Sequence, residues 1–378
     1  MRFLRGPAAV VASALLVLGA APAVPASAAA AAAPAAPRDR VDGWATASPS
    51  SLGLRPARLD ALAAGARAAD STCYAVVRHG RLARDWNWGT ARTTPREVFS
   101  ITKSVTSALV GIAVRDGSLR LDDRVSRYVP QWRGTASETV TVRNLLSNDS
   151  GRFWSLDSDY GALVQARNRT RYAVGLPQQY PPGSAWAYNN AAIQVLEAVL
   201  RRATGTPVDR YAARRLFAPL AMRHTRMGRD ASGRSTSVFF GLQTTCLDLA
   251  RFGRLYLGRG AVDGRRILSR GWVRRSVGVS STVHNAAYGL LWWLNRPGPL
   301  RGATDAVDAQ GQPVAPMTGQ LAPGAPASTY AALGLGGQVL LVDPRSGTVV
   351  VRLGRPDLSD RAAYGFADAA RVVTEALR

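Results

Sequence analysis

The sequence contains one lysine, Lys103, among 48 lysine and arginine residues. All the other basic side chains are arginines, whose guanidinium groups stay protonated in proteins. Burial and neighbouring groups can instead turn an ammonium group into a neutral amine that acts as a base. Lys103 is therefore the one lysine that the chain offers for such a role, although codon bias toward arginine would also explain the excess.

Cysteine and histidine are also scarce, with two and three copies. His79, His224 and His284 are far apart and show no metal-ligand spacing, so we expect neither a metal site nor another cofactor. A Ser-His-Asp triad stays open, because triads assemble in space, but the Gly-x-Ser-x-Gly pattern is missing. Cys73 and Cys246 would favour a disulfide in an oxidising compartment, with two buried thiols as the alternative.

No apolar run in the sequence is long enough to cross a bilayer with any margin. Residues 1–5 are basic, residues 8–20 are apolar, and residues 25–28 supply small side chains at a cleavage site. We interpret residues 1–28 as a secretory signal peptide, which predicts a secreted, extracellular protein without a transmembrane anchor after cleavage. Residues 29–52 would then be a low-complexity linker.

The formal net charge of the chain is +23. Such an excess of arginine can indicate binding to nucleic acid or attraction to an anionic surface. The arginines are scattered through amphipathic segments and do not cluster with aromatic residues, so we interpret them as solvated faces and expect no nucleic-acid partner. A cationic exterior would still suit an anionic cell wall.

The order of the predicted elements indicates an α/β fold. Strands are predicted at residues 73–78, 82–88, 288–294, 329–333, 338–342 and 348–353. Helices are predicted at residues 58–69, 100–115, 142–146, 191–203, 207–217, 245–257 and 362–377. This order predicts one antiparallel sheet built from both ends of the chain, flanked by the N- and C-terminal helices, with an inserted helical subdomain.

We place the folded domain at residues 53–378. Residues 53–98 and 235–378 would form its α/β part, and residues 99–234 its helical part. Residues 295–328 are too long for an ordinary hairpin loop, so they would form a lid or be partly disordered.

Ser100 precedes Lys103 by three residues, at the start of a predicted helix. This spacing places both side chains on one face of the helix, a turn apart. The pattern is the Ser-x-x-Lys arrangement of acyl-transferring serine enzymes. By itself it is weak evidence, because a serine precedes a lone lysine by three residues in roughly one of fifteen sequences by chance.

Two further motifs follow in the chain. Tyr188 lies in Tyr188-Asn189-Asn190, before a predicted helix, where a tyrosine can relay protons and Asn190 would point to the same side of an extended segment. Ala332-Leu333-Gly334-Leu335 lies between two predicted strands. Glycine there permits close approach by a substrate or another backbone, and an exposed strand edge can offer an N–H to an oxyanion. A plain glycine hairpin is the alternative.

These motifs, in this order, resemble those of the serine β-lactamase-related family. That family contains class C β-lactamases, D-alanyl-D-alanine carboxypeptidases, family VIII esterases and 6-aminohexanoate-oligomer hydrolases. The likeness covers roughly residues 98 to 354 and includes residues 144–151, 217–222, 248–253 and 337–344. It implies the β-lactamase/penicillin-binding-protein-like fold.

The resemblance also implies a mechanism with an acyl-enzyme. Ser100 would attack a carbonyl, while Lys103 and Tyr188 would move its proton. Asn190 would bind Lys103 or the substrate. The backbone N–H groups of Ser100 and Leu335 would form the oxyanion hole.

The substrate pocket is less well defined by sequence. Gly334 would border the substrate. Tyr160, Trp154 and Trp186 are candidates for the pocket wall, each with core packing as the alternative.

The third motif departs from the family pattern. Ala332 stands where β-lactamases and carboxypeptidases have Lys or His, and Leu333 replaces a hydroxyl. A substrate carboxylate thus loses its usual local partner. We therefore expect a secreted serine hydrolase that cleaves an ester or amide bond in a small-molecule or short peptide-like substrate. The alternatives are a D-alanyl-D-alanine carboxypeptidase or β-lactamase acting on cell-wall peptides or β-lactams, and a non-catalytic cell-wall-binding member.

Overall fold

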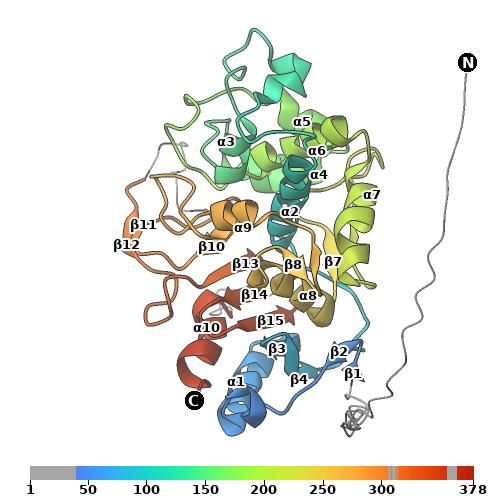
Figure 1. Cartoon of the computed structure of the whole chain (residues 1–378). Coiled ribbons are helices and arrows are strands. Elements are labelled where there is room, and N and C mark those ends of the chain that lie inside the picture. Colours follow the sequence, from blue (N-terminus) through green and yellow to red (C-terminus); the bar gives the residue numbers. More distant parts are fainter. Residues whose placement is uncertain (1–39, 305–307, 309–311, 313, 356–363) are drawn as a thin grey trace, which may run out of the picture. The chain divides into compact units, whose positions relative to one another are not determined.

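The computed structural model describes residues 40–304, 308, 312, 314–355 and 364–378 (Figure 1). The predicted signal peptide and residues 29–39 of the predicted linker lie outside the described residues. Residues 40–52 are folded, so the predicted linker has to be shortened. They form a short hairpin and one 3-10 turn, and the buried Trp44 indole donates to the carbonyl oxygen of Leu247. Within the described residues, no helix combines the length and apolar character that a membrane span requires.

One antiparallel sheet of six strands lies at the centre of residues 40–378, in the order β10-β13-β14-β15-β3-β4. Segments from the two ends of the chain meet where β15 pairs with β3, which confirms the predicted sheet and the α/β class. The bounds of its strands are β3 (Ser71–Arg78), β4 (Arg81–Asn87), β10 (Trp293–Leu294), β13 (Tyr330–Gly334), β14 (Gln338–Asp343) and β15 (Thr348–Gly354).

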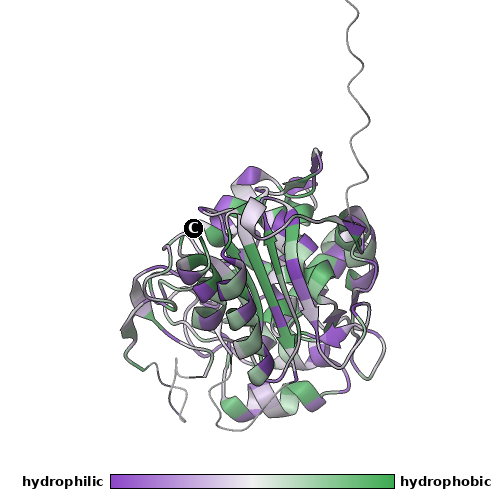
Figure 2. Cartoon of the chain, turned by 90° about the horizontal axis from the view of Figure 1, so that it is seen from below, coloured by the Kyte–Doolittle hydropathy of each residue, from purple (hydrophilic) through white to green (hydrophobic). Residues whose placement is uncertain are grey.

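Helices cover both faces of this sheet, so its inner strands β14, β15 and β3 are largely apolar on both sides (Figure 2). On β3, Tyr74 and Val76 pack into the cluster that contains residues of α1 (Pro56–Ala68) and α10 (Phe366–Glu375). Ala75 and Val77 point to the opposite face, toward the cluster of α8 (Cys246–Leu257). This alternation follows from the two-residue period of a strand.

The helical part lies on the α8 side of the sheet (Figure 1). Its helices are α2 (Ile101–Arg115), α3 (Val142–Ser147), α4 (Leu163–Gln165), α5 (Arg169–Gly175), α6 (Asn190–Thr204) and α7 (Val208–Ala212). Helix α9 (Arg270–Val277) and the small strands β5 (Arg96–Glu97), β6 (Arg226–Met227), β7 (Leu242–Thr244), β8 (Ala261–Val262) and β9 (Arg265–Arg266) complete this region.

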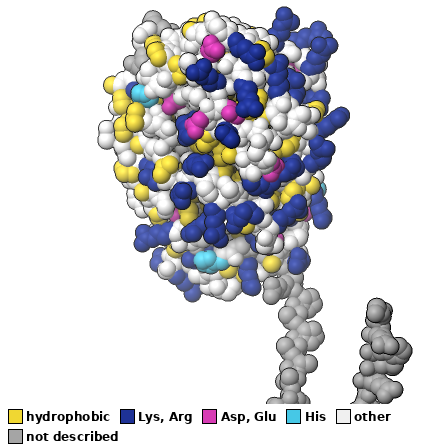
Figure 3. All heavy atoms as spheres, turned by 45° about the horizontal axis from the view of Figure 1, so that its top comes forward, with side chains coloured by type: hydrophobic (Ala, Val, Ile, Leu, Met, Phe, Trp, Pro, Cys, Tyr) yellow, Lys and Arg dark blue, Asp and Glu magenta, His cyan; other side chains and the backbone are white. Residues whose placement is uncertain are grey.

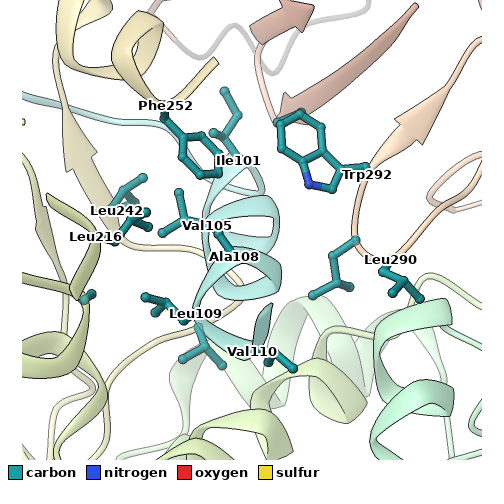
Figure 4. Close-up of a cluster of buried hydrophobic side chains, with 14 of the residues drawn as sticks. Ile101, Val105, Ala108, Leu109, Val110, Leu216, Leu242, Phe252, Leu290 and Trp292 are labelled. Carbon is teal, nitrogen blue, oxygen red and sulfur yellow. The ribbon is translucent and has the colours of Figure 1, made fainter. Parts of the chain in front are cut away.

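Helix α2 is the buried axis of the helical part. Every residue from Ile101 to Ala113 is buried, and apolar side chains surround the helix on several sides (Figure 4). Most of these buried residues are apolar, and the polar ones among them, such as Ser104 and Thr106, donate hydrogen bonds to backbone carbonyl oxygens. Burial of α2 carries the residues at its N-terminus into the interior as well.

The predicted strand at residues 288–294 is mostly wrong. Trp293 and Leu294 pair with β13, and the rest of the segment adds one isolated bridge, between Tyr288 and Trp293. Leu291 instead adopts a left-handed φ of 60°, its N–H donates to Leu146 O, and its own carbonyl accepts from the Ser104 hydroxyl. The apolar run at residues 288–294 packs against α2. A buried segment without strand pairing needs the same apolar residue types as a buried strand.

Residues 295–328 contain a small two-stranded sheet within their described part. Its strands are β11 (Gly298–Leu300) and β12 (Met317–Gly319). The buried Asn295 anchors the segment by donating to the carbonyl oxygens of Ala322 and Ala325. The role of this segment as a lid stays a prediction.

A disulfide joins Cys73 on β3 to Cys246 at the start of α8. The two cysteines are 173 residues apart in sequence. The bridge therefore ties the central sheet to the helix that covers it, and the alternative of two buried thiols is wrong.

Basic side chains are spread over the visible face in Figure 3, with few acidic ones among them. Some arginines share one carboxylate, as Arg115 and Arg215 do at Asp116. The described surface is therefore strongly cationic.

Candidate active site

The chain makes a tight turn just before Ser100. Phe99 has a left-handed φ of 47°, which is unusual for a bulky residue, and Val98 is fixed by a hydrogen bond to Leu242 O. A Cβ on Gly334 would come 2.3 Å from Val98 O, so only glycine fits at the end of β13. The close backbone approach expected at Gly334 is therefore present, and it brings β13 beside the turn that carries Ser100.

Lys103 lies one helical turn after Ser100 and is only 2% exposed. Its Nζ is 2.7 Å from Ser100 Oγ and 3.0 Å from Phe239 O, to which it donates. The same atom is 4.7 Å from the centre of the Tyr188 ring. Burial lowers the pKa of Lys103 to about 7, against the opposing effect of the Asp159 carboxylate. A substantial fraction of Lys103 is thus neutral at neutral pH, as a general base requires.

Tyr188 is buried within an aromatic cluster. Its ring stacks on Trp293 at 5.5 Å and meets the edge of Tyr288 at 6.1 Å. Burial raises the pKa of Tyr188, and a hydrogen bond with the Ser100 side chain opposes this rise. Tyr188 is therefore a neutral phenol in contact with the same hydroxyl as Lys103. The sequence analysis missed Tyr288 and Trp293, because residues 288–294 were assigned to a regular strand.

Asp159 is a further residue of the site that the sequence analysis missed. It lies in a π-helical turn, Asp157–Ala162, and is almost fully buried. Its carboxylate accepts hydrogen bonds of 2.8 Å from the backbone N–H groups of Asn190 and Ala191, at the start of α6. Burial raises the pKa of Asp159 to about 6, while these N–H groups and Lys103 oppose that rise. No spacing rule connects Asp159 to Ser100, so no sequence pattern indicates that Asp159 belongs to the site.

Asn190 and Tyr160 lie together at the edge of the site. The Asn190 side chain hydrogen-bonds Tyr160, and its Oδ1 is buried without a partner among the described residues. No hydrogen bond between Asn190 and Lys103 occurs in the described part of the chain, where Phe239 supplies the oxygen for Lys103. This leaves the second expected role, in which Asn190 accepts from a substrate N–H. Tyr160 is 38% exposed, as a pocket-wall residue would be.

The two tryptophans proposed for the pocket are buried behind Tyr188. Trp154 donates from its indole to the Tyr188 carbonyl oxygen, at 3.1 Å. Trp186 packs edge-on against Tyr288, with ring centres 5.3 Å apart. Both therefore have the structural role that was kept as the alternative.

The third motif presents an apolar wall. Ala332 is buried in the core that contains α2, and Leu333 packs against the aromatic cluster of Tyr188. Leu335 follows β13 directly, and its side chain is 53% exposed. The predicted role of its N–H in an oxyanion hole stays a prediction.

The described hydrogen bonds of the three histidines involve neither Ser100 nor Lys103. His79 lies in the turn between β3 and β4, the His224 N–H donates to Asp248, and His284 contacts the Gly183 carbonyl. No group of three or more His, Cys, Asp or Glu side chains in the described part of the chain could hold a metal ion.

Comparison with known proteins identifies the family of the chain. The family whose sequence model matches the chain is Beta-lactamase, and the match covers residues 59–368. The chain belongs to the Beta-lactamase family. Members of this family with this fold are serine hydrolases.

Two relatives of the chain differ in how much of each protein is matched. The chain is 25% identical over 346 residues to 6-aminohexanoate-dimer hydrolase from Paenarthrobacter ureafaciens, covering 82% of this chain and 81% of that protein. It is 29% identical over 140 residues to Protein flp from Staphylococcus aureus strain MW2, covering 35% of this chain. The matched part spans only 28% of Protein flp.

A solved structure shows the same fold. A penicillin-binding protein homologue from Caulobacter crescentus superposes with a TM-score of 0.58 and 16% sequence identity. The similarity covers 85% of this chain and 97% of that one. The predicted β-lactamase/penicillin-binding-protein-like fold is therefore confirmed.

Proposed function

We propose that this protein is a serine hydrolase that cleaves an ester or amide bond through an acyl-enzyme on Ser100. The observation that carries the proposal is the 2.7 Å separation between Ser100 Oγ and the buried Nζ of Lys103. A lysine with a pKa of about 7 can accept the hydroxyl proton while Ser100 Oγ attacks the substrate carbonyl. The new C–O bond and the broken bond to the leaving group give an acyl-enzyme.

Proton transfer in both half-reactions involves the same groups. Lys103 and Tyr188 both contact Ser100, so either can pass the proton to the departing alkoxide or amine. In the second half-reaction, water adds to the acyl carbonyl and loses a proton to the same pair, and Ser100 regains its proton as the acid product leaves. Because the two groups are coupled, a pH profile reports the pair and not one residue.

The substrate class follows from the walls of the site. Ala332 and Leu333 place no basic group on β13, so a substrate carboxylate has no partner there. Tyr160, which hydrogen-bonds Asn190, and Leu335, which directly follows β13, both expose large hydrophobic side chains. These features favour neutral esters or amides as substrates.

The test is covalent labelling with a fluorophosphonate probe, together with hydrolysis of p-nitrophenyl esters of graded chain length, simple amides and nitrocefin. We expect labelling and ester hydrolysis in the wild type, and a loss of at least about 10³-fold in Ser100→Ala. Ser107→Ala is the matched control, because Ser107 is a buried serine two turns further along α2.

The competing functions give different results in the same assay. Efficient nitrocefin turnover or D-alanine release would replace the proposal with a β-lactamase or carboxypeptidase. A folded wild type that is neither labelled nor active on any substrate, but binds peptidoglycan, would make it a non-catalytic wall-binding protein.

We also propose that the protein is secreted. The Cys73–Cys246 disulfide supports this, because such bonds persist in oxidising compartments. N-terminal sequencing of protein recovered from the culture medium should give a start near Ala29. Protein retained inside the cell with residues 1–28 intact would contradict the proposal.

A further inference from the structure

The helical part contains a cavity with a volume of about 1030 Å³, and neither Ser100, Lys103 nor Tyr188 lines it. Its walls include α5, the C-terminal half of α6, the 3-10 turn Pro130–Trp132 (η3) and residues 174–178. An adjoining hollow shares Asn168, Arg171 and Arg234 with it. Helix α6 runs from Asn190 in the active site to Ala198 in the cavity wall, about 12 Å along its axis at 1.5 Å per residue. The cavity is thus distinct from the active site.

The charge of this cavity has one sign. None of its lining residues, all within the described ranges, is an aspartate or glutamate. Five are arginines, namely Arg152, Arg171, Arg201, Arg202 and Arg234.

Arg152 is the most unusual of these arginines, because it is only 4% exposed. Its guanidinium stacks on Trp132 at 4.2 Å and donates to the Ser137 hydroxyl and to the carbonyl oxygens of Ala173 and Leu176. All these acceptors are neutral, and no carboxylate pairs with Arg152 within the described part of the chain. A buried charge without a counter-ion is costly, and an anionic ligand would compensate it.

The other arginines leave the wall positively charged. Arg171 and Arg234 are exposed, and no described carboxylate pairs with either side chain. Arg202 donates to the Tyr128 carbonyl oxygen, which is neutral. Arg201 alone is paired, with the buried Glu197 at 3.1 Å. Only one of the five guanidinium groups is therefore neutralised by a carboxylate.

We propose that this cavity binds a chain of repeated phosphate groups. Guanidinium groups form paired, charge-assisted hydrogen bonds to phosphate, and each phosphate offers several acceptor oxygens to a wall that is rich in donors. The volume exceeds the needs of one phosphate and suits several consecutive groups. The aromatic rings in the wall, Trp132 and Tyr128, are buried and cannot stack on bases, which argues against nucleic acid.

The cationic exterior in Figure 3 would attract such a chain, and the cavity would fix it. Non-specific attraction of the phosphate chain should weaken when any surface arginine is neutralised, wherever that arginine lies. Specific binding in the cavity should weaken only when the cavity arginines are changed. This difference makes the proposal testable with charge-matched variants.

The experiment is titration calorimetry of the full chain with tripolyphosphate and with long-chain polyphosphate as probes. We expect the double variant Arg171→Gln/Arg234→Gln to bind at least tenfold more weakly than the wild type. The matched control Arg265→Gln/Arg270→Gln, which removes two exposed arginines elsewhere, should change the affinity less than threefold. Ester hydrolysis should stay within twofold of wild type in both doubles.

Four results would overturn the proposal. They are no binding by the wild type at low salt, equal weakening in the two doubles, equally tight binding of polygalacturonate or oligo-dT, and parallel loss of ester hydrolysis in the cavity double. Arg152→Gln should also lose binding while it remains folded. If Arg152→Gln does not fold, the comparison of Arg171→Gln/Arg234→Gln with Arg265→Gln/Arg270→Gln decides the outcome.

Discussion

Lys103 and Arg152 occupy similar surroundings in two different parts of the helical region. Each is nearly fully buried, lies over an aromatic ring and contacts a serine hydroxyl, Ser100 for Lys103 and Ser137 for Arg152. Each also donates to backbone carbonyl oxygens. Burial lowers the pKa of both, to about 7 for Lys103 and to about 10 for Arg152.

The same environment has opposite consequences for these two groups. At neutral pH Lys103 can give up its proton and serve as a base, whereas Arg152 keeps its charge and needs an anion. The side chain, more than the surroundings, therefore decides whether a buried cation in this fold becomes catalytic or ligand-binding. Exchanging the two residue types tests this directly.

The largest expected effect is the loss of ester hydrolysis in Lys103→Arg. The guanidinium cannot accept the Ser100 proton, so kcat/KM for ester hydrolysis should fall by at least about 10³-fold. Lys103→Met, which is neutral and similar in length, should lose as much activity. Urea unfolding and circular dichroism should show that both variants remain folded.

A folded Lys103→Arg enzyme with wild-type activity would show that Lys103 is not the base. The proposed difference, in which Lys103 acts as a base and Arg152 keeps its charge, would then be wrong. Loss of activity in Lys103→Met together with unfolding would leave Lys103→Arg as the deciding variant.

The reciprocal change, Arg152→Lys, should mainly affect stability. A lysine cannot reproduce the planar contacts to Trp132, Ala173 and Leu176, so we expect the free energy of unfolding at pH 7 to fall by about 2–4 kcal/mol. A lysine buried there would have a lowered pKa in the folded state, so the unfolded state would bind more protons. Stability of the variant should therefore recover as the pH rises above 7.

The control for this experiment is Arg210→Lys, at an exposed position on α7, which should change stability by less than about 0.5 kcal/mol. Urea titrations at pH 7 and pH 9.5 measure both variants. If Arg152→Lys is as stable as the control at pH 7, the Arg152 site does not require a guanidinium.

Much of the fold could be predicted because local patterns determine it. The apolar spacing of residues 100–115 predicts α2, and the strand patterns near both ends predict the sheet. Spacing also placed Lys103 one turn from Ser100, where the structure has it. The prediction of a strand at residues 288–294 was mostly wrong, because an apolar run that packs around a helix has the same composition as a buried strand.

The rest of the site depends on contacts between segments far apart in the chain. Asp159 reaches the start of α6 from a π-helical turn, and neither periodicity nor spacing indicates this. Nor does anything in the sequence distinguish the buried Arg152 from the many exposed arginines. Burial of a charged residue is a property of the assembled fold, so a single sequence does not indicate which of its charges are buried.

The smallest expected effect is a shift in the pH dependence of kcat/KM. It tests the one charged neighbour by which the surroundings of Lys103 and Arg152 differ. Lys103 has a carboxylate nearby, Asp159, which holds its pKa higher than burial alone would, whereas Arg152 has no such partner among the described residues. In the wild type, kcat/KM should rise with pH through about 7, as the coupled pair of Lys103 and Tyr188 loses its first proton. Asp159→Asn removes the negative charge, so the pKa of Lys103 should fall and the rise should move to lower pH.

Asp159→Asn should also lower the free energy of unfolding by about 1.5–3 kcal/mol, because an amide oxygen replaces a carboxylate at the start of α6. A purely structural Asp159 would reduce stability and rate without moving the pH profile. The exposed neighbour Asp157→Asn serves as the control and should leave both the profile and the stability unchanged. A shift to lower pH in Asp159→Asn alone would show that this carboxylate sets the charge state of Lys103. An unmoved profile would mean that burial alone does so, as it does for Arg152.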